Sequence, residues 1–380
     1  MPLQVEERRD VIGADGRLVE ELVVNVGPSH PSTHGVGRVI VHLDGEVVTK
    51  VEPVIGYLHR GIEKMAENRT YLQVVPLTDR LDYVGSMYAN WAYCRTLERL
   101  ADIAVPERAE YIRVIVCELQ RIASHMMGLG ASAADTGAFT MFVYCFDLRE
   151  RIIEFFETLC GSRLTYNYVR PGGVSFDLPE GWLEDVSAFL ETVDAKLVEM
   201  DQLFFGNVIA RGRMKGIGVL SAEDAVAWGI TGPSARASGV NWDLRKHDPY
   251  SVYPLFDFDV VVGDNGDSYD RGRTKIFECH ESAKIIRQAI AKIPGGKFKT
   301  PLPRLIAPPA GDAYDHIESA RGTLGVYLVS DGSVRPYRMH VRSPAFCNLA
   351  ILPRLVPGHT LSDLIVVLGS LDPVFGEVDR

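Results

Sequence analysis

Residues 106–126 read PERAEYIRVIVCELQRIASHM, and this stretch decides the fold class that the sequence predicts. Pro106 suits a helix start, because the first helical residues have no partner for the N–H that proline lacks. Five apolar residues then recur at helical spacing and form one stripe: Ile112, Val116, Leu119, Ala123 and Met126. Such a stripe packs against other elements, so the sequence predicts a long, largely buried helix here.

Three further segments are longer than twenty residues and apolar on more than one face: 77–100, 137–160 and 179–205. Helices of this kind bury themselves in a bundle. Shorter helices are predicted after Gly61 and over residues 361–371.

Short strands are predicted on either side of the bundle. One hairpin turns at Asp44–Gly45, between apolar runs at 36–43 and 46–54, and a second turns at Asp331–Gly332. The predicted fold class is therefore α+β, a central bundle of long helices with small antiparallel sheets.

The same pattern divides the chain into five segments. They are a flexible or peripheral N-terminal arm (1–22), an antiparallel sheet with its loop (23–55), the helical bundle with irregular loops (56–292), a proline-rich linker (293–317), and a second hairpin with the C-terminal helix and tail (318–380).

Composition and charge exclude several classes of protein. The chain has 380 residues and a net charge of −10, which argues against a nucleic-acid binder with a basic face. No run of about 18 uncharged apolar residues is present, and the first residues do not resemble a signal peptide. The six cysteines form no CxxC pair and sit beside apolar residues, so we expect buried free thiols and no metal cluster held by this chain.

The loop His30–Gly35 reads HPSTHG and lies between two predicted strands. Histidine side chains exchange protons near neutral pH, so two of them on one shaped turn suit proton-transfer chemistry. A polar hairpin loop with incidental histidines is the alternative, and the loop by itself does not decide between the two.

Seven longer motifs carry a resemblance to one family: VGPSHPSTHG, GYLHRGIEKMAENR, DRLDYVGSM, RAEYIRVIVCELQRIASH, NYVRPGGV, ESARGTLGVYLVSDG and SLDPVFGEVDR. They resemble the D subunit, or 49 kDa-type subunit, of the proton-pumping NADH:quinone oxidoreductase, complex I. The resemblance runs from about Val23 to Arg380. It implies a fold like that of the related large subunit of nickel–iron hydrogenases.

The hydrogenase activity itself is not implied. Hydrogenases hold their metals with two cysteine pairs and a histidine, and the first pair is replaced here by Asp82 and Gly85. In the C-terminal motif, Val374, Glu377 and Arg380 stand in the ligand positions. The soft thiolate ligands are absent, so the chemistry excludes that enzyme class.

The resemblance implies a quinone site instead. It gives His34 and Tyr83 as hydrogen-bond partners of the quinone headgroup, with His30 and Thr33 in the same binding loop. Asp135 is the carboxylate that accompanies His34, where it would stabilise the protonated ring. For Asp135 an ordinary helix N-cap before Thr136 remains the alternative, and a non-catalytic scaffold remains the alternative for the chain.

The resemblance also implies the surroundings of the chain. Electrons from NADH, bound elsewhere in the complex, would arrive from a terminal 4Fe–4S cluster in the B subunit, and the quinone would be menaquinone or ubiquinone. The other expected neighbours are the C and I subunits and the H subunit of the membrane arm, which place this chain peripherally on the cytoplasmic side of the cell membrane.

Three arginines, Arg60, Arg80 and Arg170, lie in motifs that face the cluster in the family, although each could be an ordinary surface arginine. The chain departs from the family at Thr165, where a histidine is common, and in a shortened segment at 301–318. Threonine cannot titrate, so we expect a cluster potential nearly independent of pH between about 6 and 8.

We predict that the isolated chain binds no metal, because every hydrogenase ligand is replaced. Elemental analysis of the pure protein should find no stoichiometric nickel, iron or zinc. A stoichiometric amount of any of the three would contradict the prediction.

Overall fold

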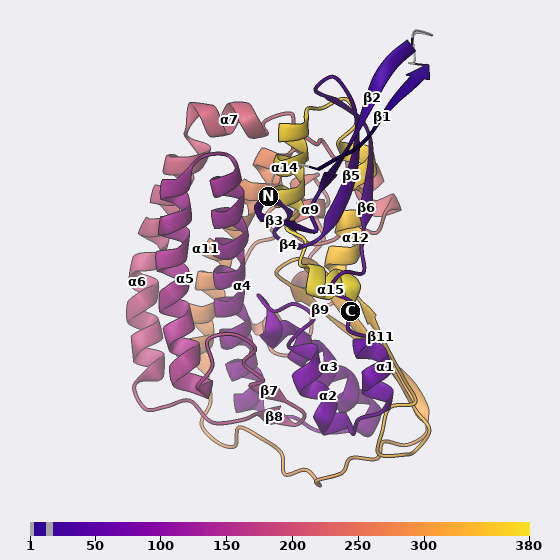
Figure 1. Cartoon of the computed structure of the whole chain (residues 1–380). Coiled ribbons are helices and arrows are strands. Elements are labelled where there is room, and N and C mark those ends of the chain that lie inside the picture. The colour runs from indigo at the N-terminus through magenta and orange to yellow at the C-terminus, as the bar shows by residue number, and fades with distance from the viewer. Residues whose placement is uncertain (1–3, 13–17) are drawn as a thin grey trace.

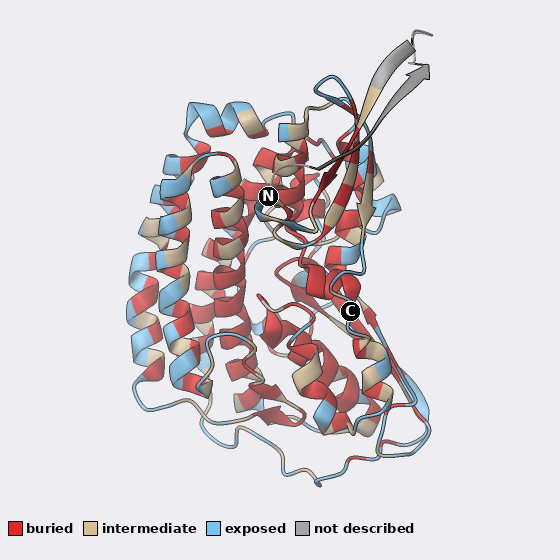
Figure 2. Ribbon diagram, viewed as in Figure 1, coloured by how far each residue is buried: buried red, intermediate tan, exposed pale blue. Residues whose placement is uncertain are grey.

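The computed structural model describes residues 4–12 and 18–380, with side chains from residue 21 onward (Figure 1). Its longest helix, α4 (Glu107–Asp135), lies in the interior and is buried along most of its length (Figure 2). Beside it lie α5 (Phe139–Cys160) and α11 (Ser268–Lys292), and α6 (Trp182–Met200) packs against these two helices on the outer side of the bundle. The π-helix η2 (Asp201–Phe205) continues α6. The predicted bundle of long helices is confirmed.

The remaining helices are short, apart from α3 and α14, and surround this bundle. They are η1 (Pro31–Thr33), α1 (Ile62–Glu67), α2 (Tyr71–Thr78), α3 (Ser86–Ala101), α7 (Val208–Met214), α8 (Ala222–Ala227), α9 (Pro233–Ala237), α10 (Leu244–His247), η3 (Tyr253–Leu255), α12 (Pro344–Ala350), α13 (Leu352–Leu355), α14 (Leu361–Leu371) and α15 (Phe375–Asp379).

The continuous helix predicted over residues 77–100 is wrong. α2 ends at Thr78, α3 begins at Ser86, and residues 79–85 form a turn between them. The carboxylate of Asp82 accepts the backbone N–H groups of Val84 and Gly85, at 3.1 and 3.0 Å. A short acidic side chain that binds nearby N–H groups competes with the helical hydrogen bonds, which is why the helix stops here.

Two antiparallel sheets flank the bundle (Figure 1). The first has the order β1 (Gln4–Ile12), β2 (Leu18–Val26), β5 (Arg38–Asp44) and β6 (Val47–Val54). The second has the order β11 (Arg338–Arg342), β10 (Gly322–Ser330) and β9 (Gly311–Ser319). Two minimal ladders, β3 (Ser29–His30) with β4 (Gly35–Val36) and β7 (Val169–Arg170) with β8 (Gly173–Val174), complete the described strands, and the α+β class is confirmed.

Both sheets contain a strand that the sequence did not predict. Residues 1–22 were expected to form a flexible or peripheral arm, but 4–12 and 18–22 belong to β1 and β2. β9 begins at Gly311, inside the predicted linker, and turns the expected second hairpin into a three-stranded sheet. β1 and β9 each pair with a neighbouring strand along nearly their whole length. Backbone hydrogen bonds therefore hold these strands in the sheets, although their sequences lack the apolar alternation that predicts a strand.

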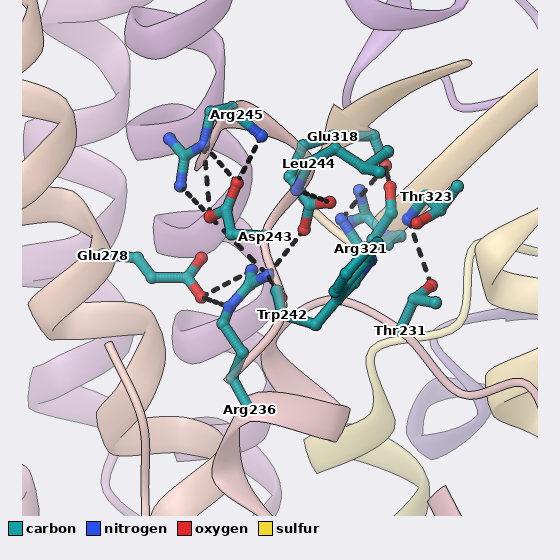
Figure 3. Close-up of polar contacts among 12 residues, drawn as sticks. Thr231, Arg236, Trp242, Asp243, Leu244, Arg245, Glu278, Glu318, Arg321 and Thr323 are labelled. Atoms are coloured by element: carbon teal, nitrogen blue, oxygen red, sulfur yellow. Dashed lines mark hydrogen bonds and ion pairs between the residues drawn. The ribbon is translucent and has the colours of Figure 1, made fainter. Parts of the chain in front are cut away.

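The bundle interior also holds a chain of buried ion pairs (Figure 3). Arg236 lies between Glu278, at 2.8 Å, and Glu318, at 2.7 Å. Arg245 joins Asp243, at 2.7 Å, to Glu118 on α4, at 3.0 Å. These contacts tie α4, α11, β9 and the loop after α9 together through fully buried charges.

Glu118 is the end of this chain on α4, and four side chains hold it ionised. Burial favours the neutral acid, but Arg245 and Arg121, with hydrogen bonds from Ser282 and Tyr253, lower the pKa of Glu118 to about 2. The hydroxyls of Ser282 and Tyr253 each donate to it at 2.6 Å. Because the folded pKa lies below the ordinary one, the stability that Glu118 provides is present at neutral pH and is lost as pH falls toward 2.

We predict that Glu118→Gln lowers the free energy of unfolding by about 3–5 kcal/mol, because Arg245 then keeps a buried charge without its full partner. The midpoint of thermal unfolding, followed by circular dichroism at pH 7, measures the loss. Asp147→Asn is the matched control, since it breaks an exposed pair with Lys196 (2.7 Å) that is worth about 0–1 kcal/mol. Equal, small shifts in both variants would contradict the prediction.

Candidate functional site

A cavity of about 710 Å³ lies where the loop after β2, the turn at 79–85, α4 and the segment after α14 meet. Its size is that of a pocket for a small organic molecule. The wall residues come from all four elements and from the β9–β10 turn: Pro28, Ser29, His30, Pro31, His34, Gly35, Val36, Tyr83, Val84, Met127, Gly128, Ala131, Arg321, Asp372, Pro373 and Val374.

The HPSTHG loop is held in shape by its own residues. The hydroxyl of Thr33 lies 2.7 Å from the carbonyl oxygen of His30 and 2.8 Å from that of Gly35. Thr33 is fully buried and does not line the cavity, so the structure places it as a support of the loop, whereas His30 and His34 line the cavity. His34 adopts a left-handed backbone (φ 54°), which turns the chain back toward β4.

His34 and Asp135 meet although 101 residues separate them in the chain. The Nε2 atom of His34 lies 2.5 Å from Oδ2 of Asp135, and both side chains are nearly buried. Asp135 is the last residue of α4, whereas α5 begins at Phe139 with Ala138 at its N-cap, so the alternative interpretation of Asp135 as an N-cap is wrong.

Gly369 on α14 allows this pair to fit. A Cβ atom at Gly369 would lie 3.1 Å from Cε1 of His34 and 3.1 Å from Oγ of Ser132. Contacts that short are tighter than side chains normally accept, so the helix can approach the pair closely only with glycine at this position.

Tyr83 enters the cavity from the turn at 79–85. Its hydroxyl lies 3.5 Å from the position that a Cβ of Gly35 would take, so it reaches the loop that carries His34. Burial, and then the carboxylates of Asp82 and Asp372 against the opposing effect of Arg321, raise the pKa of Tyr83. The phenol is therefore protonated at neutral pH and can donate a hydrogen bond.

The polar floor of the cavity is centred on Arg321. Its guanidinium donates to Oδ2 of Asp82 at 2.8 Å and to Oγ of Ser124 at 3.0 Å, and lies 3.4 Å from Oδ1 of Asp372. Nζ of Lys275 lies 3.1 Å from the other oxygen of Asp372. Arg321 and Asp372 were not predicted as site residues, although both lie in motifs, ESARGTLG and SLDPVFG, that carry the family resemblance.

Comparison with known proteins identifies the family. The family model described as "Respiratory-chain NADH dehydrogenase, 49 Kd subunit" matches residues 135–310 and 303–380. The D subunit of the NADH-quinone oxidoreductase of Clostridium beijerinckii is 50% identical over 361 residues, which cover 95% of this chain and 98% of the relative. The chain belongs to this family.

Other members are equally similar. The D subunit from Dehalococcoides mccartyi is 52% identical over 362 residues, and the one from Bacillus mycoides is 48% identical over 361 residues. Each match covers 95% of this chain and 99% of the relative. The chain is thus a subunit of an oxidoreductase, NADH-quinone oxidoreductase, as the motifs predicted.

Two features are absent from the described part of the chain. Within residues 4–12 and 18–380, no helix combines the length and the apolar character that crossing a bilayer requires. Within the same residues, no three histidine, cysteine or acidic side chains are grouped as a metal site.

Acidic groups occupy two of the positions that hold metal ligands in hydrogenases. Asp82 is paired with Arg321, and Glu377 is fully buried on α15. At Gly85 a Cβ would lie 2.5 Å from Oδ2 of Asp82, so the side chain of Asp82 fills the place of the second residue of the pair. The Arg321 guanidinium is the cation paired with Asp82 at this point.

The three arginines that were expected to face a cluster, Arg60, Arg80 and Arg170, do not line the 710 Å³ cavity. Arg60 and Arg80 line a hollow of about 240 Å³, and Nη1 of Arg80 donates to the carbonyl of Pro76 at 2.6 Å. Nε of Arg170 donates to the carbonyl of Asn167 at 3.1 Å. Thr165 lies in the same loop as Asn167, with a left-handed backbone (φ 50°).

Asp79 connects this loop with the turn of Tyr83. Its Oδ1 accepts the backbone N–H of Asn167 at 3.2 Å, and its Oδ2 is buried without a hydrogen-bond partner among the described residues. Burial raises the pKa of Asp79 to about 6, against the smaller opposing effects of Asn167, Asn90, Arg80 and Arg170. Asp79 was not predicted from the sequence, because an acid next to an arginine looks like a solvated pair.

Proposed function

We propose that this subunit binds the quinone of the complex in the 710 Å³ cavity and supplies protons to its headgroup. The observation that carries the proposal is the meeting, at one cavity, of a tyrosine hydroxyl with a histidine that is paired to a carboxylate. A quinone takes up two electrons and two protons as it becomes a quinol, so its two oxygens need two proton donors.

Tyr83 and His34 are the proposed donors, one for each oxygen of the headgroup. The raised pKa of Tyr83 keeps its hydroxyl protonated until the reduced ring draws the proton away. Asp135 orients the imidazole through the 2.5 Å contact and stabilises the ring when it carries a second proton. Val36, Met127 and Val374 offer apolar surface to the ring and tail.

The electron input and the position in the complex belong to the same proposal. Electrons from NADH would come from a 4Fe–4S cluster of the neighbouring B subunit, on the face of Arg60, Arg80 and Arg170, and quinone reduction would drive proton translocation. The turn at 79–85 supports this arrangement, because Arg80 lies on that face and Tyr83 lies in the cavity. Contacts with C, I and H subunits would hold the chain peripherally on the cytoplasmic side of the membrane.

We predict that Tyr83→Phe impairs quinone reduction without impairing assembly. The variant keeps the ring and removes only the hydroxyl, so headgroup binding should weaken by about 1–3 kcal/mol, or roughly 5- to 150-fold in affinity. His34→Gln should also lower quinone reduction, because an amide cannot take up and release a proton as imidazole does. Quinone reductase activity of the assembled complex, as a function of quinone concentration, measures both.

Two controls make the result specific. Reduction of an artificial acceptor that bypasses the cavity should remain unchanged in both variants. Tyr144→Phe, on the exposed surface of α5, makes the same chemical change away from the cavity and should be silent. Equal loss of quinone and artificial-acceptor activity would mean damaged assembly and would favour the scaffold alternative.

A second prediction concerns Thr165 and the cluster potential. A histidine there would take up a proton as the cluster gains an electron, so Thr165→His should make the potential fall as pH rises through the neutral range. In the native chain the nearby titrating acid is Asp79, with a pKa of about 6. The titration of Asp79 therefore narrows the flat range expected from Thr165 alone: the native potential should change little between pH 7 and 8, and should be higher below pH 6, where Asp79 is neutral.

Redox titration of the assembled complex from pH 5.5 to 8, followed by electron paramagnetic resonance of the cluster, tests this prediction. Asp79→Asn should remove the rise at low pH and leave the neutral range flat. A native potential that falls steeply between pH 7 and 8 would show that neither residue governs proton coupling.

A further inference from the structure

One end of the helical bundle exposes apolar side chains from three elements to solvent. α5 begins at this end, α6 runs into η2 there, and α7 forms its outer corner (Figures 1 and 2). Val208 and Ile209, at the start of α7, are the two most exposed large apolar residues among the described side chains, with 82% and 69% of their surface exposed. Phe139 and Val143 of α5 and Leu203 of η2 are exposed at the same end.

The exposure of the α7 side chains is fixed by how the helix is held. The side chain of Asn207 caps α7 by accepting the backbone N–H of Ile209 at 2.8 Å. Ala210 and Met214, four residues apart, are buried on the inner face of the helix. Because a helix turns about 100° per residue, Val208 then falls on the outer face and Ile209 at its edge. The apolar tip therefore belongs to an anchored helix.

The same helix carries an excess of positive charge. The segment 207–216 contains three cations and no acidic residue, in a chain whose net charge is −10. The cations are Arg211, Arg213 and Lys215. The side chains of Arg211 and Arg213 have no ion pair or hydrogen bond with any described residue. The acid that precedes the helix, Asp201, is already paired with Arg273, at 3.0 Å. The positive charge of α7 is thus left for an external anion.

This end of the bundle is also the end of the cavity loop. α14 contacts both α7 and η1, the turn just before His34 (Figure 1). Phe139 follows Asp135, the partner of His34, by only four residues. A quinone with an apolar tail dissolves in the bilayer, so a surface that binds the membrane beside this loop agrees with the proposed function.

We propose that the bundle-end surface, made of α7 with Phe139, Val143 and Leu203, binds the headgroup layer of an anionic phospholipid bilayer. Apolar side chains at a projecting corner, flanked by free cations, suit shallow insertion among such headgroups. Val208 and Ile209 enter the layer, while Arg211 and Arg213 bind lipid phosphates. The core of a protein interface is instead poor in charged residues, which favours lipid over a protein partner. The proposal goes beyond the quinone function and does not depend on it.

The first test is co-sedimentation of the full-length chain with lipid vesicles that contain no quinone. Vesicles of phosphatidylcholine with about 30% phosphatidylglycerol should bind the chain at least about tenfold more tightly than vesicles of phosphatidylcholine alone. High salt should weaken this binding, because it screens the cations. Equal binding to the two kinds of vesicle, or no binding to either, would overturn the inference.

Two pairs of substitutions test which residues bind. Arg211→Gln with Arg213→Gln should weaken binding to the anionic vesicles by about 10- to 30-fold. Arg304→Gln with Arg335→Gln is the matched control, since it removes the same charge from exposed sites in the segment before β9 and in the β10–β11 turn. Circular dichroism checks that both variants are folded. Equal binding by the two variants would overturn the inference.

The assembled complex provides a second measurement that needs no variant. In its membrane, a photoactivatable phosphatidylglycerol should label peptides from α7 and from the start of α5. If these peptides take no lipid label and cross-link to another subunit instead, the surface is a protein interface and the inference is wrong. Neither measurement involves quinone reduction, so a silent Tyr83→Phe would count against the quinone function alone.

Discussion

The position of Arg321 is the constraint on which the cavity depends. Its guanidinium reaches the turn of Tyr83 through Asp82, α4 through Ser124, and the end of α14 through Asp372. A guanidinium with almost no exposed surface is stable only when its donors are satisfied, and here each partner belongs to a different cavity wall. The same contacts that neutralise the charge therefore fix the distance between walls that are distant in sequence. If Arg321 were removed, Asp82 would lose its cation and Asp372 would keep only Lys275.

Much of the fold follows from periodicity in the sequence, and the exceptions have local causes. The helix at 361–371 has the bounds that its apolar pattern predicted, and α4 and α5 lie where long helices were expected. The break at 79–85 could not be predicted, because Leu81 and Val84 continue a helical spacing. The Asp82 side chain accepts the N–H groups that would otherwise donate within a helix. Periodicity reports which face is buried, and it does not report a side chain that replaces a backbone acceptor.

The site could be predicted only in part, because its residues come from segments that are far apart in the sequence. The loop of His34 could be recognised as a shaped turn with two imidazoles, but the spacing of residues in the sequence does not show that this loop contacts Asp135. That pairing came from the family resemblance, and the 2.5 Å contact agrees with it. Arg321 and Asp372 were missed because an isolated arginine and an acid before proline are common on surfaces. Their importance comes from burial, which is a property of the folded chain.

The acids at the replaced ligand positions differ in chemistry from a thiolate pair. A thiolate pair offers soft donors and attracts a metal ion, whereas the carboxylates of Asp82 and Glu377 are hard oxygen donors that bind either protons or cations. Asp82 is already matched by the fixed guanidinium of Arg321, so a metal ion would have to displace a cation that the protein cannot release. Glu377 takes no part in this ion pair, and its neutral form avoids a second negative charge in the same buried space. Arg321 is thus shared by Asp82 and Asp372, and the buried Glu377 avoids a further negative charge beside them by keeping its proton.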